Sequence, residues 1–195
     1  MKRGRTTKPA HTRLIRWLAG GAGLLLWISA GLAPGEGGSP PKFREYEIKA
    51  AFLLNFLQFV EWPAAVASNS AAPMVIGILG EDPFGAVLDE NIKGESVHGR
   101  PLAIKRERKA SQLKDCQLVF IARSEKGQLK DCLNELRGAS VLTVSDLDSF
   151  CRQGGMIALF NEGGKVRFEI NQTAALESKL KISSKLLRLG RPMGK

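Results

Sequence analysis

Histidine, tyrosine and cysteine are scarce in this sequence: its 195 residues include two His, one Tyr and three Cys. Beyond residue 33 the only histidine is His98, so the chain lacks the histidines that acid–base and nucleophilic catalysis generally use. The Gly-x-Ser-x-Gly motif is absent, and the turn Gly77–Gly85 matches neither nucleotide-binding glycine motif. We therefore expect a protein that is not an enzyme and that binds no metal ion and no cofactor.

Acidic residues are absent from the first 33 residues. Six Lys and Arg lie between Met1 and Trp17, and the apolar run 18–33 follows them. That run is 16 residues long, shorter than the roughly 20 that a membrane-spanning helix needs. A basic start, an apolar centre and small residues at the end are typical of a secretory signal peptide. We expect residues 1–33 to be a signal peptide, the alternative being an uncleaved anchor, and the Gly- and Pro-rich residues 34–42 to be a flexible tether.

The charge of the remaining chain is modest. The full sequence has 29 Lys and Arg against 19 Asp and Glu, a net charge of +10. Without the six cations of the first 33 residues, 23 basic residues face 19 acidic ones, which leaves a net charge of +4. Such a charge is ordinary for a soluble domain and does not indicate nucleic-acid binding. The length of residues 34–195 suits a single domain with its own core.

Three cysteines lie beyond the signal: Cys116, Cys132 and Cys151. Export to an oxidising compartment would permit one disulfide, whose pairing the sequence does not choose. The alternative is that all three are small buried apolar residues. No Cys-x-x-Cys pair is present, so the spacing does not predict a zinc site.

Residues 45–60 form the clearest predicted helix, because apolar residues recur at helical spacing and Pro63 follows. Its apolar surface is too wide to be covered on one side only. We expect Phe56, Phe59 and Trp62 to be core residues or contacts with a second subunit or a partner. Towards the C-terminus no acid follows Glu177, so Lys185 and Arg188 are expected in solvent or at the surface of an anionic partner.

Six short apolar runs predict strands, and helical stretches separate several of them. The runs are Met74–Leu79, Leu102–Arg106, Leu118–Ala122, Val141–Val144, Met156–Phe160 and Val166–Ile170. The helical stretches are Pro83–Glu90, Glu125–Leu136 and Asp146–Gln153. Asn171 is expected to cap one C-terminal helix, and either Ser183 or Ser184 a second. The hairpin signal Asn161–Gly164 joins the last two strands. We predict an α/β fold: one domain with a roughly six-stranded mixed sheet, mostly parallel with an antiparallel hairpin edge, flanked by helices on both faces.

Asp146 and Asp148 follow a predicted strand, at the edge where α/β proteins place their sites. Ser145-Asp146 is also an ordinary helix start, which we take as the better interpretation. A small-molecule cleft near Asp82, Ser124 and Asp146 is a second possibility for the function of the chain.

Three blocks of the sequence together resemble the YfiR family. They are YEIKAAFLLNFLQFVEWP (Tyr46–Pro63), VLTVSDLDSFCRQGGMIALF (Val141–Phe160) and VRFEINQTAALESKLKISSKLLRLG (Val166–Gly190). The resemblance extends over the chain from residue 43 onward, and we expect a YfiR-like domain at residues 43–191.

The resemblance implies an exported, non-catalytic regulator that acts in the periplasm. Such proteins bind the periplasmic part of a membrane-embedded diguanylate cyclase of the YfiN type and repress cyclic-di-GMP synthesis. It also implies a homodimer and an outer-membrane lipoprotein that sequesters the repressor. Relatives carry stabilising disulfides, but Ala158 stands here where a second cysteine could pair with Cys151. Alternatives are regulation of another membrane sensor, such as a histidine kinase, and a periplasmic small-molecule receptor.

Overall fold

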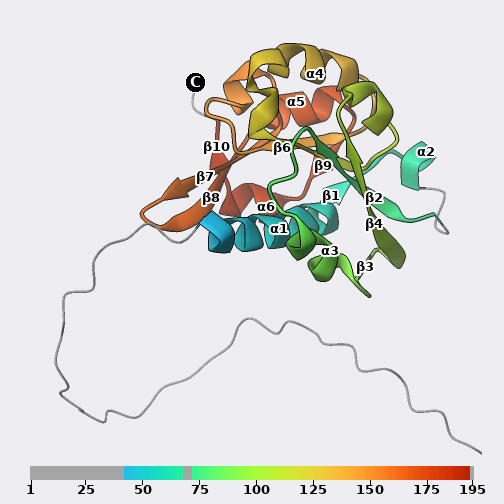
Figure 1. The fold of residues 1–195 in the computed structure, drawn as a ribbon. Helices are drawn as coiled ribbons and strands as arrows, with labels where there is room; N and C mark the ends of the chain where they lie inside the picture. Colours follow the sequence, from blue (N-terminus) through green and yellow to red (C-terminus); the bar gives the residue numbers. More distant parts are fainter. Residues whose placement is uncertain (1–41, 68–71, 194–195) are drawn as a thin grey trace, which may run out of the picture. The chain divides into compact units, whose positions relative to one another are not determined.

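The computed structural model describes residues 42–67 and 72–193 (Figure 1). The expected signal peptide and all but the last residue of the expected tether lie outside these residues. Within them, eight strands form one mixed sheet in the order β10-β8-β7-β6-β5-β2-β4-β3, and β1 pairs with β9 in a separate ribbon. In chain order the strands are β1 (Val60–Glu61), β2 (Met74–Leu79), β3 (Ser96–Val97), β4 (Arg100–Glu107), β5 (Leu118–Ile121), β6 (Leu142–Ser145), β7 (Ile157–Glu162), β8 (Lys165–Ile170), β9 (Lys181–Ile182) and β10 (Arg191–Pro192).

The predicted fold class is confirmed. All six runs predicted to be strands are strands, with ends that shift by one or two residues. The central strands β4, β2, β5, β6 and β7 run parallel to one another, and every residue of β5 and β6 is buried. Helices cover both faces of these strands, so side chains on both faces are buried. This explains why their apolar residues are continuous rather than alternating with polar ones.

The parallel strands are flanked by an antiparallel pair on each side, β3 with β4 and β7 with β8. At one end β7 and β8 form the predicted hairpin, whose turn residues Gly163 and Gly164 have φ of 58° and 75°. Two consecutive residues with positive φ are typical of a tight hairpin turn and favour glycine. The prediction made this hairpin the edge, but β10 pairs parallel with β8 beyond it. The two-residue strands were not predicted, because two residues are too few to show a period.

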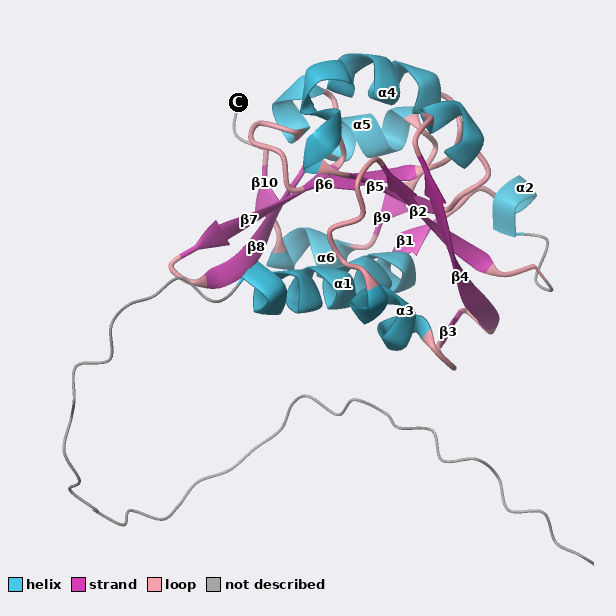
Figure 2. Cartoon of the chain, in the orientation of Figure 1, coloured by secondary structure: helices cyan, strands magenta, loops and turns pink. Residues whose placement is uncertain are grey.

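The helices cover the two faces of the sheet, with α1, α3 and α6 on one side and α4 and α5 on the other (Figure 2). Their bounds are α1 (Lys42–Phe59), α2 (Ala64–Ala67), α3 (Ala86–Ile92), α4 (Leu129–Leu136), α5 (Gln172–Glu177) and α6 (Ser184–Leu189). The long helix α1 buries Leu53 and Phe56 completely, and the Phe56 ring lies 5.3 Å from that of Phe168 on β8. No helix in the described part of the chain combines the length and hydrophobicity needed to cross a bilayer.

The predicted helix Glu125–Leu136 is 3-10 as far as Gln128 and α-helical only from Leu129. Two other predicted helices differ more from the structure. At the first, Asp82 accepts a hydrogen bond from the backbone N–H of Phe84 in a turn, and α3 begins only at Ala86. At the second, residues 146–150 form turns, followed by a single 3-10 turn at Cys151–Gln153. A helix is excluded there because Ser149, with φ of 57°, is in the left-handed region. The predicted caps at the C-terminus are correct: Asn171 and Ser183 each accept a hydrogen bond from the first turn of α5 and α6.

The three cysteines are free and buried. They lie in the apolar layer between the sheet and α4. Burial raises the pKa of Cys116 and Cys151 to about 12 and that of Cys132 to about 11. The cysteines therefore have the arrangement of small buried residues, and the disulfide stays a prediction for thiol counting to test.

Candidate functional site

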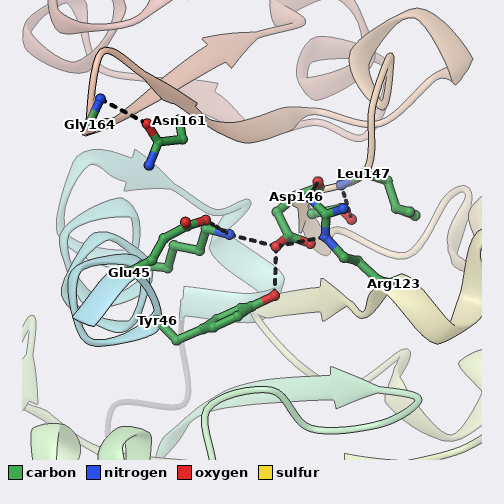
Figure 3. Close-up of polar contacts among 9 residues, drawn as sticks. Glu45, Tyr46, Arg123, Asp146, Leu147, Asn161 and Gly164 are labelled. Carbon is green, nitrogen blue, oxygen red and sulfur yellow. Dashed lines mark hydrogen bonds and ion pairs between the residues drawn. The ribbon is translucent and has the colours of Figure 1, made fainter. Parts of the chain in front are cut away.

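A buried carboxylate lies where β6 ends. Asp146 directly follows β6, and its side chain is 1% exposed. Its Oδ2 accepts hydrogen bonds from the Tyr46 hydroxyl at 2.8 Å and from Lys49 Nζ at 2.6 Å (Figure 3). Both donors belong to α1, about 100 positions earlier, so this carboxylate connects the helix to the end of the strand.

Two further charged side chains complete the network. Lys49 Nζ lies 2.6 Å from Glu45 Oε1, one helical turn earlier on α1. Arg123, just after β5, places its Nε 3.2 Å from Asp146 Oδ2 and donates from its Nη2 to the Asp146 backbone carbonyl at 2.8 Å. The two acids and two bases balance in charge. We call these residues, with Tyr46, the Asp146 network.

The surroundings keep the Asp146 carboxylate charged at neutral pH. Burial disfavours the charged form of Asp146, but the hydrogen bond and charge of Lys49 outweigh it, so the pKa of Asp146 is lowered. Burial and the hydrogen bond to Asp146 raise the pKa of Tyr46 far above its usual value, which keeps the phenol protonated as a donor. A carboxylate held ionised by three donors is a poor general base, so the network is suited to binding and to positioning α1 rather than to proton transfer.

One atom of the network lacks a partner. Asp146 Oδ1 is buried and makes no hydrogen bond within the described residues. Asp146 lines a cavity of about 570 Å³, together with residues from α1, from the segment after β6, and from β7, β8 and β10. The cavity-lining residues are Glu45, Lys49, Arg123, Asp146, Leu147, Asp148, Ser149, Arg152, Ala158, Leu159, Phe160, Asn161, Glu169 and Arg191.

The cavity has no evident catalytic set. Its lining includes neither histidine nor cysteine. Within residues 42–67 and 72–193, no three His, Cys, Asp or Glu side chains come together as metal ligands. The lining combines charged side chains of both signs with residues of β7, among them Phe160. Such a concave surface can recognise a small polar molecule.

Of the three residues predicted to share a cleft, only Asp146 lines this cavity. Asp82 instead pairs with Arg106 at 2.7 Å. Ser124 accepts a hydrogen bond from the backbone of Glu81. The structure therefore does not bring the three residues together in this cavity.

The sequence did not predict that Glu45, Tyr46 and Lys49 of α1 belong to a site with Asp146. The available signal was Lys49, which recurs with Leu53 and Phe56 at the spacing of one buried helix face. A lysine on such a face needs a buried acid as partner. The sequence alone does not show which acid supplies it, because Asp146 is 97 residues away.

The predicted partner or dimer contacts divide into three groups. Phe56 has no exposed surface, so it is a core residue and is not available to a partner. Phe59 and Trp62 are half-buried at the end of α1 and just beyond it. Lys185 and Arg188 on α6 are exposed, and Lys185 Nζ lies 5.1 Å from the centre of the Phe59 ring. Four of the five residues therefore reach the surface, on and beside two helices in contact.

Comparisons with known proteins assign the domain. A solved structure described as a conserved domain protein from Vibrio cholerae O1 biovar El Tor str. N16961 has a similar fold, with a TM-score of 0.51 and 13% sequence identity. The match covers 75% of this chain and 59% of that one, so this chain spans less than two thirds of its length. No protein of curated function matches. The sequence model described as YfiR/HmsC-like matches residues 46–191. The chain therefore belongs to the YfiR/HmsC-like family.

Proposed function

We propose that this protein is exported to the periplasm and there represses a membrane-embedded diguanylate cyclase, which lowers cytoplasmic cyclic-di-GMP. The observation that carries the proposal is family membership over residues 46–191. Two features of the chain support it. The first 33 residues have the pattern of a secretory signal peptide. The cavity at Asp146 offers groups for binding but no catalytic set.

Repression needs no chemistry by this protein. A binding protein lowers the output of a sensor when it binds the inactive conformation more tightly than the active one. The shift cannot exceed the difference between the two affinities: a ratio of about 100 moves an evenly balanced sensor to roughly 99% inactive. We infer that this difference arises where the surface of the repressor contacts the periplasmic part of the cyclase.

The surface formed by α1 and α6 is the best match to such a contact. We call it the α1–α6 surface and define it by Ile48, Phe59, Trp62, Lys185, Arg188 and Leu189. Ile48 is 40% exposed and Leu189 is 66% exposed, and both are large apolar side chains. Exposed apolar and aromatic groups next to Arg are typical of protein–protein contacts.

A homodimer and an outer-membrane lipoprotein that removes the repressor are further parts of the proposal. Both would compete with the cyclase if they use the α1–α6 surface. Binding by either one would then release the cyclase by mass action.

The test measures cyclic-di-GMP in cells that lack the gene and in cells complemented with the full chain or with a form lacking residues 1–33. We expect cyclic-di-GMP to rise on deletion and to fall again only with the full chain. No change on deletion would contradict repression of a cyclase and would favour another membrane sensor, such as a histidine kinase. Restoration by the form lacking residues 1–33 would contradict action in the periplasm.

A matched pair of variants tests the surface. Leu189→Asp places a charge on the α1–α6 surface, whereas Leu176→Asp places the same charge on α5, where Leu176 is 57% exposed. We expect Leu189→Asp to lose repression and Leu176→Asp to keep it, with both proteins folded. The opposite result would place the contact elsewhere on the domain.

A further inference from the structure

The cavity beside Asp146 has more hydrogen-bond acceptors than free donors. Asp146 Oδ2 takes the donors of the network, while its Oδ1 takes none. Two more lining acids, Asp148 and Glu169, make no ion pair among the described residues. Lys49 and Arg123 line the cavity too, but both already pair with acids of the Asp146 network.

The other two bases of the lining do not remove this excess. Arg191 pairs with Glu162, which lies outside the lining, and its guanidinium carbon is 5.0 Å from the centre of the Phe160 ring. Of the four bases in the lining, only Arg152 makes no ion pair with another described residue. One free cation therefore stands against two free carboxylates and one buried carboxylate oxygen without a donor. A buried charged acceptor without a hydrogen-bond donor carries an uncompensated desolvation cost, so a ligand that supplies a donor there removes that cost.

We infer that this cavity binds a small molecule bearing a primary ammonium group. An ammonium carries three N–H donors and a positive charge, so it can serve Asp146 Oδ1 and also face the carboxylates of Asp148 and Glu169. The lining also includes Phe160, whose ring lies 5.0 Å from the guanidinium carbon of Arg191 and offers apolar surface to the carbon atoms of the ligand. The volume of about 570 Å³ is in the range of small-ligand sites.

Access to Asp146 Oδ1 is through Arg123. Arg123 also lines the cavity, its side chain is 58% exposed, and its Nε lies 3.2 Å from Asp146 Oδ2, so the proposal requires this guanidinium to move when a ligand reaches the buried Oδ1. Arg123 can keep its contact with the Asp146 backbone carbonyl or exchange it for water. The ligand then completes the coordination of a carboxylate that is already ionised.

The consequence for regulation rests on the proposed function, but the binding itself does not. Helix α1 supplies Glu45 and Lys49 to the cavity and also Ile48 to the α1–α6 surface. A ligand at Asp146 therefore contacts the helix that carries the proposed cyclase contact. Ligand binding would bias the position of α1, and with it the affinity for the cyclase.

Calorimetry on the purified protein tests the site without any cyclase. The probes are ethanolamine and 1,4-diaminobutane as ammonium compounds, acetate as the anion, and glycine as a molecule with both charges. We expect saturable binding of the ammonium compounds at millimolar concentration and none of acetate. Glycine binding more tightly than ethanolamine would support the site and would show that a base of the lining also binds the carboxylate of the ligand. Acetate binding alone, or no saturable binding of any probe, would overturn the inference.

Matched variants locate the binding. Glu169→Gln and Asp148→Asn each remove one cavity charge, and we expect each to weaken ethanolamine binding roughly tenfold. Glu90→Gln removes the same charge from α3, away from this cavity, and should leave the affinity unchanged. Thermal unfolding checks that all three variants are folded. Equal affinity in the cavity variants and the control would place the ammonium elsewhere and refute the site.

Discussion

Replacing Asp146 by asparagine should strongly destabilise the domain. The substitution keeps the shape of the side chain but removes the charge that holds Lys49, whose side chain is 2% exposed. Breaking a buried ion pair by removing one partner costs about 3–5 kcal/mol. Lys49 keeps Glu45 at 2.6 Å, and that side chain is 23% exposed, so we place the loss near the lower end, at about 3 kcal/mol.

Urea unfolding measures this loss. With a slope of about 2 kcal/mol per molar urea, the midpoint should fall by about 1.5 M. Asp148→Asn is the control, because Asp148 is exposed and should change stability by less than about 0.5 kcal/mol. The double variant Lys49→Met with Asp146→Asn removes both charges and should lose less than the sum of the two single variants. A loss below about 1 kcal/mol for Asp146→Asn, or simple additivity in the double variant, would refute the buried pair as the anchor of α1.

The remaining predictions concern pH, thiols, packing and capping. Because the folded pKa of Asp146 is lowered, its contribution is fully present above its unfolded pKa of about 3.9 and is lost as pH falls through the folded value, so the stability gap between wild type and Asp146→Asn should close in acid urea titrations. Thiol titration of the denatured, non-reduced protein should find three free cysteines, and a count of one would show a disulfide. Half-buried Trp62 changed to alanine should lose about 2 kcal/mol, less than a fully buried ring, and a loss of 4 kcal/mol would show deeper burial. Asn171→Ala removes both the cap of α5 and a hydrogen bond to the Cys151 carbonyl, and should lower urea-unfolding stability by about 1–2 kcal/mol; no loss would contradict the cap.

Patterns that local residues determine were predictable from the sequence. The run Leu118–Ala122 is apolar throughout because both faces of β5 are covered, and this places it at the centre of a sheet. The hairpin at Gly163 and Gly164 and the caps Asn171 and Ser183 follow from the chemistry of one or two residues. Each of these features depends on neighbours within a few positions.

Features set by distant contacts were not predictable in the same way. Residues 146–153 have the composition of a helix start, yet Asp146 is fixed by donors about 100 positions earlier and the chain turns instead. The strand β10 exists because residues 191–192 lie beside β8, and nothing in two residues indicates it. The candidate site also depends on a distant contact. The sequence indicated Asp146 as an acid that follows a strand and Lys49 as a lysine on an apolar helix face, but it did not indicate that the two side chains form a pair.

The ion pair at Lys49 also determines which residues of α1 reach the surface. Apolar contacts alone would hold α1 against the sheet. They would fix the rotation of α1 about its own axis only weakly, because apolar packing is not directional and apolar side chains can repack. A buried lysine cannot leave its carboxylate without a large electrostatic cost, so the pair sets the rotation of the helix. Ile48, one position earlier, is then turned by about 100° and faces outward. The Asp146 network thus connects the shape of the cavity to the position of Ile48 on the α1–α6 surface, which is what a ligand-controlled repressor would require.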